Sequence, residues 1–155
     1  MLNDDYRDIL RAFSTERVRF LLVGAYAMAA HGYPRATMDI DLWIDPSADN
    51  VTAVLRALEQ FGAPMDEISA KDLSEENLVF QIGVAPRRID VLTGVSGLTF
   101  ADAYANSIEI DIEGTSARVL CLNDLIKNKR ASGRKQDAAD LEVLESLRDS
   151  NSETN

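Results

Sequence analysis

The sequence predicts a single α/β domain in which a mixed β-sheet is flanked by helices, with further helices at the C-terminal end. Its length of 155 residues is typical of one domain. A chain of this size can bury ~70% of its unfolded surface without disulfide cross-links. Short apolar runs that end at glycine or proline alternate with segments whose apolar residues recur at helical spacing. We expect the domain to span residues 1–148 and the polar segment 149–155 to be a disordered tail.

The N-terminal half contains two strand-like and three helix-like segments. Residues 3–13 carry apolar side chains at helical spacing behind two aspartates in the first turn. The continuous apolar run 18–23 stops at Gly24, and an alanine-rich segment follows it. Pro46 ends the next strand-like segment. We therefore expect helices over residues 3–13, 25–31 and 47–61, and strands over residues 18–23 and 39–45.

The C-terminal half begins with the least regular part of the sequence. Residues 62–77 are rich in Gly, Pro and charged residues, which indicates a mobile loop or a short helix. Residues 107–112 alternate isoleucine with polar residues, as a half-buried strand does, and residues 114–116 are expected to form a turn. Further strands are expected over residues 78–84, 88–92 and 118–121, and helices over residues 100–105, 123–131 and 135–147.

The formal net charge of −10 argues against a general DNA- or RNA-binding module. Non-specific affinity for nucleic acid comes mainly from basic residues that neutralise phosphates, and only segments 87–88 and 127–135 are locally basic. The longest apolar run, residues 20–30, is far shorter than the ~20 residues of a membrane span. Charged residues are spread through the first twenty positions, which is unlike a secretory signal. The single cysteine, Cys121, is consistent with a reducing compartment. We therefore expect a cytoplasmic protein without a membrane partner.

Two aspartates, Asp39 and Asp41, lie in the strand-like segment Ala-Thr-Met-Asp-Ile-Asp-Leu-Trp-Ile-Asp. Side chains alternate between the two faces of a strand, so residues two apart project from the same face. Neighbouring carboxylates raise each other's pKa unless a cation lies between them. Mg²⁺ prefers oxygen ligands, commonly one or two carboxylates completed by water and substrate phosphates. The pair therefore predicts half of a metal site for phosphoryl or nucleotidyl transfer.

Two further features carry chemistry. Asp90 lies inside the otherwise apolar segment 88–92, and because burial of an unpaired carboxylate is costly, it either has a hydrogen-bond partner or binds a metal. Gly24 and Ala25 end a buried strand and open a helix. Glycine lets the backbone approach a ligand closely, and a helix N-terminus offers free N–H groups to an anion. Taken alone, such a junction more often serves packing.

The order of these features, a glycine turn, then Asp-x-Asp, then a lone aspartate on a later strand, resembles the DNA polymerase β-type nucleotidyltransferase superfamily. The segment VGAYAMAAHGYPRATMDIDLWID, residues 23–45, is similar to small bacterial and archaeal members, which include AbiEii-type and MenT-like toxin nucleotidyltransferases. The segment LNDLIKNKRASGRKQDAADLEVL, residues 122–144, resembles the C-terminal ending of such domains. The resemblance covers most of residues 18–147 and implies the nucleotidyltransferase fold for residues 1–148.

A two-metal site is the first consequence of the resemblance. It implies that Asp39 and Asp41 bind two Mg²⁺ (or Mn²⁺) ions and that Asp90 completes the site. In such chemistry one ion activates the attacking oxygen and the other steadies the leaving pyrophosphate. A further candidate role for Asp90 is that of the base for the acceptor hydroxyl.

Binding of the nucleotide triphosphate is the second consequence of the resemblance. It implies backbone N–H contacts from Gly24 and Ala25, and contacts from the charged side chains of Arg35 and Lys129. Relatives have Gly-Ser or Gly-Gly where this chain has Gly24-Ala25. A hydroxyl contact to phosphate is therefore missing here, whereas backbone contacts are retained.

Several charged residues also have structural interpretations. Lys129 could be a solvated helix lysine, since surface lysines are the norm. Arg134, Asp137 and Asp140 follow at i, i+3 and i+6 and could form an ion-paired helix start, which we prefer for Asp140. His31 is expected to be a structural hydrogen-bonding residue rather than a catalytic one.

The predicted activity is transfer of a nucleoside monophosphate from an NTP to an acceptor hydroxyl. The acceptor is RNA, with tRNA ends as the precedent among the toxins, or a protein side chain, and the resemblance suggests a toxin–antitoxin or abortive-infection system with a cognate antitoxin. The alternative is a non-catalytic regulatory protein of the same fold that binds nucleotide or a partner protein. A plain α/β binding module with coincidental acidic strands is a third interpretation. The presence of all three carboxylates, Asp39, Asp41 and Asp90, favours the enzyme.

Overall fold

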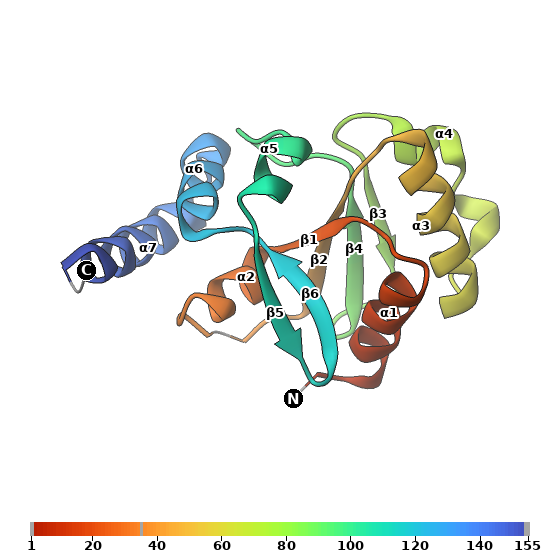
Figure 1. Ribbon diagram of the computed structural model, residues 1–155, viewed down its shortest axis with the longest axis horizontal. Helices are drawn as coiled ribbons and strands as arrows, with labels where there is room; N and C mark the ends of the chain where they lie inside the picture. The colour runs from red at the N-terminus through yellow and green to blue at the C-terminus, as the bar shows by residue number, and fades with distance from the viewer. Residues whose placement is uncertain (1, 35, 154–155) are drawn as a thin grey trace.

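A six-stranded mixed sheet forms the centre of the protein in a computed structural model that describes residues 2–34 and 36–153 (Figure 1). The strand order is β3-β4-β2-β1-β6-β5. Neighbours β1–β2, β3–β4 and β5–β6 are antiparallel, whereas β2–β4 and β1–β6 are parallel. The strands are β1 (Phe20–Val23), β2 (Asp39–Ile44), β3 (Val79–Ile82), β4 (Arg88–Leu92), β5 (Ile108–Ile112) and β6 (Thr115–Val119). The prediction of a mixed sheet flanked by helices is confirmed.

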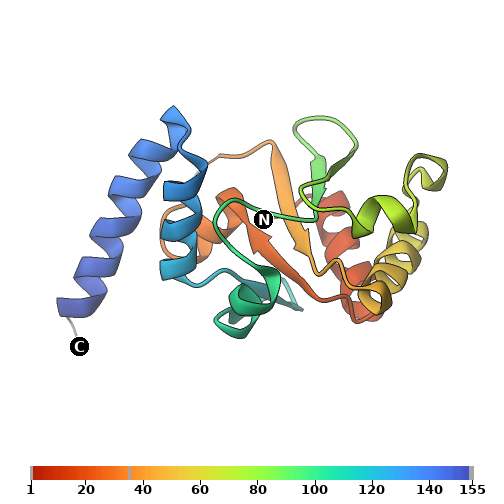
Figure 2. The same cartoon turned by 90° about the horizontal axis from the view of Figure 1, so that it is seen from above.

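Helices lie on two sides of this sheet. Figures 1 and 2 show α1 and α3 together on one side and α6 and α7 on the other. The α-helices are α1 (Asp4–Thr15), α2 (Gly24–Ala30), α3 (Ala48–Phe61), α4 (Ala70–Ser74), α5 (Phe100–Ala105), α6 (Leu122–Ser132) and α7 (Lys135–Glu153). A 3₁₀ turn, η1 (Met65–Glu67), precedes α4. Among the residues that the structure describes, no helix is both long and apolar enough to cross a membrane.

The alternation of side chains along β2 and β4 separates an apolar face of the sheet from a polar one. Ile40 and Leu42 on β2 are paired with Ile89 and Val91 on β4, and all four are at most 1% exposed. Residues of α6 and of the α6–α7 corner line a cleft over the other face. The apolar face is therefore the one that α1 and α3 cover. Complete burial of one aliphatic side chain contributes about 1.5–3 kcal/mol, so this face holds β2 and β4 firmly together.

The segment 62–77 contains η1 and the short helix α4, which begins with a capping box between Ser69 and Asp72, in agreement with the second of the two alternatives given for it. Other element boundaries differ from the sequence-based expectation. The β5–β6 turn is Glu113-Gly114, both with positive φ, so β6 starts at residue 115, where a turn was expected. Helix α7 continues to Glu153 because the sequence has neither glycine nor proline after residue 147. Residues 149–153 of the predicted tail are thus helical, and residues 154–155 lie outside the described part of the chain.

Candidate active site

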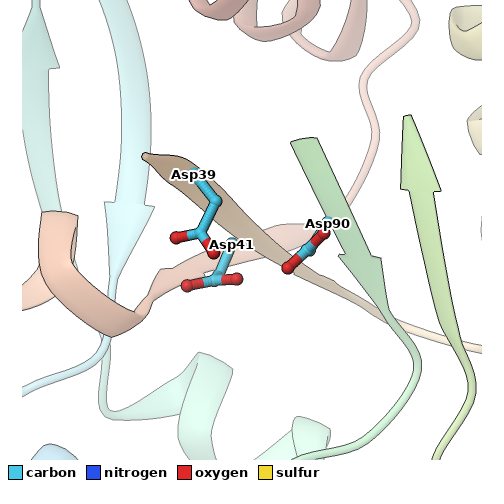
Figure 3. Close-up of side chains that lie close together, drawn as sticks. All are labelled: Asp39, Asp41 and Asp90. Atoms are coloured by element: carbon cyan, nitrogen blue, oxygen red, sulfur yellow. The ribbon is translucent and has the colours of Figure 1, made fainter. Parts of the chain in front are cut away.

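Three carboxylates converge on the polar face of the sheet. Asp41 of β2 is paired in register with Asp90 of β4, and Asp39 lies two residues earlier on the same face of β2. One carboxylate oxygen from each residue lies within 4.8 Å of the other two. Figure 3 shows the three side chains on neighbouring strands with their carboxylates turned toward one another. The parallel pairing of β2 with β4 therefore brings together groups that are about fifty positions apart in the sequence.

Gly24 closes one side of this cluster. It directly follows β1, begins α2 and has φ +66°, a conformation that side chains other than glycine rarely adopt. A β-carbon at this position would collide with Oδ2 of Asp41. Gly24 and Ala25 both line the cleft that contains the carboxylates.

The cleft has a volume of about 470 Å³, within the usual range for small-molecule sites. The carboxylates form its acidic part, and Gly24 and Ala25 border it. Its other polar lining residues come from β3, β4, the loop before β2, α6 and the α6–α7 corner: Thr37, Gln81, Arg88, Asn128, Lys129, Arg134 and Gln136.

The carboxylates have perturbed proton affinities. Burial, followed by repulsion from Asp39 and Asp90, raises the pKa of Asp41 to about 7. Burial also raises the pKa of Asp90, although the nearby Arg88 guanidinium opposes this effect. Crowded acids of this kind favour proton or cation uptake, because either one relieves the repulsion.

The donor set fits a hard divalent cation. Asp90 Oδ1 is buried and accepts no hydrogen bond in the described part of the chain, although Arg88 Nε lies 3.2 Å from it. A buried carboxylate oxygen without a hydrogen bond is costly unless a cation satisfies it. Three carboxylates within reach of one ion are ligands that Mg²⁺ or Mn²⁺ accepts.

Lys129 belongs to a buried ion cluster at the α6–α7 corner. Its side chain is 7% exposed, and Nζ lies 3.2 Å from Asp137 Oδ1 and 3.3 Å from Asp140 Oδ2. Burial raises the pKa of Asp137, but hydrogen bonds from Arg134, Ser132 and Lys129 outweigh this effect and lower it to about 2. Lys129 is therefore not a solvated lysine. Arg134 and Asp137 form the ion pair expected at the helix start, whereas Asp140 pairs with Lys129 of α6.

The remaining predicted residues have separate outcomes. Arg35 lies outside the described residues. His31 donates from Nε2 to the carbonyl oxygen of Leu120 at 2.7 Å, which is the structural role expected for it. The sequence reasoning did not identify Arg88, whose guanidinium contacts Asp39 and Asp90.

Arg134 was interpreted only as part of the ion-paired helix start, yet it also lines the cleft. Its Nε donates to Asp137 Oδ2 at 2.9 Å while the side chain is 61% exposed. For Arg88, a signal was present in the sequence: it lies two residues before Asp90 and must share its face of the strand. For Arg134, nothing in the local sequence indicated that the α6–α7 corner would border the cleft.

Fold and site together define a nucleotidyltransferase-like α/β domain, and comparisons with known proteins agree. The chain belongs to a protein family described as "Nucleotidyltransferase of unknown function (DUF6036)", whose model matches residues 6–150. It is also similar in structure to a Thermotoga maritima protein described as a candidate nucleotidyltransferase. That similarity has a TM-score of 0.55 and 17% sequence identity, covers 99% of this chain and 96% of the other, and supports the fold alone. No curated protein matches the sequence.

Proposed function

We propose that the chain is a metal-dependent nucleotidyltransferase that moves a nucleoside monophosphate from an NTP to an acceptor hydroxyl. The acceptor oxygen forms a bond to the α-phosphorus. The bond between the α-phosphorus and the oxygen that it shares with the β-phosphorus breaks, and pyrophosphate leaves. The observation that carries this proposal is the convergence of Asp39, Asp41 and Asp90 beside Gly24 in a cleft of about 470 Å³. Two Mg²⁺ or Mn²⁺ ions would supply the positive charge that offsets the triphosphate and the leaving pyrophosphate.

The three carboxylates have distinct proposed roles. Asp39 and Asp41 project from one strand and would hold the metal ions, and Asp90 would complete the site from the neighbouring strand. Asp90 is also the proposed base, which accepts the proton of the attacking hydroxyl.

Contacts to the triphosphate are proposed from the cleft wall. Gly24 and Ala25, which line the cleft, would contribute backbone N–H groups. The resemblance adds the guanidinium of Arg35, a residue outside the described part of the chain. Lys129 would act mainly by positioning, because its charge is already balanced by two buried carboxylates. Arg134 is then the better source of positive charge, since Asp137 orients its guanidinium while the side chain remains largely exposed.

The acceptor and the cellular setting are proposed from the resemblance of residues 23–45 and 122–144 to small toxin nucleotidyltransferases. The acceptor is an RNA, with a tRNA end as the leading candidate, or a protein side chain. A toxin–antitoxin or abortive-infection system, with a cognate antitoxin as the partner, is the corresponding setting. The net charge of −10 is consistent with recognition of one particular acceptor and not of nucleic acid in general.

Label position distinguishes nucleotidyl transfer from other phosphate chemistry. The protein is incubated with each of the four NTPs, Mg²⁺, and total cellular RNA and protein. Label from [α-³²P]NTP is expected to enter an acceptor, whereas label from [γ-³²P]NTP is expected only in released pyrophosphate. Transfer of γ-label to an acceptor would indicate a kinase and contradict the proposal.

Substitution of Asp41 tests whether the carboxylate cluster is required for nucleotidyl transfer. Asp41→Asn is expected to lower transfer at least 100-fold with an unchanged circular dichroism spectrum, because it removes a charge that only metal binding requires. Asp49→Asn, on the exposed start of α3, is the control and is expected to retain full activity. Tight nucleotide binding that is independent of metal, without any transfer, would instead support a regulatory protein of the same fold.

A further inference from the structure

A cation of the protein itself already contacts two of the three carboxylates. Arg88 Nη2 donates to Asp39 Oδ2 at 2.5 Å, and Arg88 Nε lies 3.2 Å from Asp90 Oδ1. Arg88 is the first residue of β4 and is paired in register with Asp39, so the two side chains leave the sheet on the same face. The cluster thus contains three carboxylates and one guanidinium within a small volume.

The backbone of Arg88 is fixed, whereas its side chain can move. Its N–H donates to the carbonyl oxygen of Met38 at 3.3 Å, and its own carbonyl oxygen accepts the Tyr6 hydroxyl at 3.0 Å. The side chain is 36% exposed and borders the cleft. A long side chain at the edge of a cleft can rotate into solvent without disturbing the strand.

The two contacts of Arg88 differ in kind. The contact with Asp39 is a charge-assisted hydrogen bond. The contact with Asp90 is close, yet neither Arg88 Nε nor Asp90 Oδ1 satisfies hydrogen-bond geometry with any described residue. The attraction to Asp90 is therefore that of a nearby charge, which a metal ion can replace without loss of a directional bond.

We propose that Arg88 is a built-in counter-cation that stabilises the metal-free carboxylate cluster and competes with divalent ions for Asp39 and Asp90. The inference rests on the proposed metal site and adds a determinant of its affinity. A divalent ion that binds these oxygens must displace the guanidinium, at least from Asp39. Arg88 therefore weakens metal binding and keeps the three like charges together when no metal is bound.

The test is the affinity for Mn²⁺ alone, measured by electron paramagnetic resonance of the free ion and by calorimetry. Arg88→Met is expected to bind Mn²⁺ about 10-fold more tightly than the wild type, a difference of about 1.4 kcal/mol. Arg88→Lys, which keeps the charge but loses the planar fork, is expected to gain about 3-fold. Arg87→Met is the matched control: this neighbour pairs with Asp5, not with the cluster, and its loss is expected to leave the affinity unchanged.

Stability of the metal-free protein gives a second measurement. Arg88→Met is expected to lower the urea midpoint of the wild type but to have much less effect in an Asp39→Asn background, because the main partner is then neutral. Equal or weaker Mn²⁺ binding by a folded Arg88→Met or Arg88→Lys would overturn the inference. If the wild type transfers nucleotide while neither variant gains affinity, this inference alone fails. If the wild type and both variants fail to bind Mn²⁺, the proposed metal site fails as well.

Discussion

The structure requires two things of the residue at position 24: a left-handed backbone conformation and the absence of a β-carbon next to Asp41. Replacement of Gly24 by alanine tests both requirements. The first is conformational: φ is +66°, and the left-handed region costs an L-residue about 1–2 kcal/mol. The second is spatial: the new methyl group would occupy the place of Asp41 Oδ2, at the far end of a side chain that can rotate. The expected result is therefore a modest loss of stability together with a displaced carboxylate.

The matched control is Gly133→Ala. Gly133 has almost the same φ, +64°, but a β-carbon there would meet nothing within 4 Å. Both variants are expected to lower the unfolding free energy by about 1–2 kcal/mol in urea titrations. Only Gly24→Ala is expected to weaken Mn²⁺ binding. We expect a loss of about 10–100-fold, the range typical when a group that orients a metal ligand is altered.

Mn²⁺ titration followed by electron paramagnetic resonance, together with urea unfolding of the same samples, checks the prediction. Equal Mn²⁺ affinity in the two variants would refute the reasoning, because it would mean that Gly24 does not set the position of Asp41. A decrease of several kcal/mol in the unfolding free energy of Gly24→Ala alone would also refute it. Such a decrease would show that the backbone moves to accommodate the methyl group and that the Asp41 carboxylate does not.

Two further predictions concern buried charge. The pKa of Asp41 is about 7 in the folded protein and ~3.9 in an unfolded chain, so the folded state binds more protons between these values. The urea midpoint of the metal-free protein should therefore fall as the pH rises from about 4 to about 7, with a flatter profile in Asp41→Asn, and Mn²⁺ affinity should fall as the pH drops below about 7. A urea midpoint that rises with pH across this range would contradict the predicted direction of the pH dependence. Lys129→Met removes the ammonium group from two buried carboxylates and should cost about 3–5 kcal/mol in urea unfolding, whereas the exposed Lys127→Met should stay within about 0.5 kcal/mol. Comparable values for both lysines would show that the cluster is solvated.

The alternation of residues in β2 and β4 made much of the candidate site predictable. Asp39 and Asp41 had to share a face, and so did Arg88 and Asp90, because side chains two apart in a strand point the same way. The sequence did not determine that β4 pairs in parallel with β2 and aligns Asp41 with Asp90. Strand order and register depend on packing between segments that are distant in sequence.

The ion cluster at the α6–α7 corner could not be predicted from local sequence spacing. Lys129 and Asp137 are eight residues apart with Gly133 between them, and no helical spacing relates them. Their contact exists because Gly133 adopts a left-handed conformation and reverses the chain between two helices. Burial of Lys129 follows from that reversal, so an interpretation based on surface lysines failed.

Clustering of three carboxylates opposes folding, and the two-faced construction of β2 and β4 offsets this cost. Asp39 and Asp41 on β2 and Asp90 on β4 share one face of the sheet, and fully buried aliphatic residues of the same two strands lie on the other face. The packing of these aliphatic residues resists separation of β2 from β4, so the repulsion is instead relieved by a proton, by Arg88 or by a metal ion. The raised pKa of Asp41 and the contacts of Arg88 reflect the first two forms of relief. A divalent ion that displaced both the proton and Arg88 would relieve the same repulsion. For this reason, neutralising Asp41 should make the metal-free protein more stable at pH 8 while it removes the proposed activity.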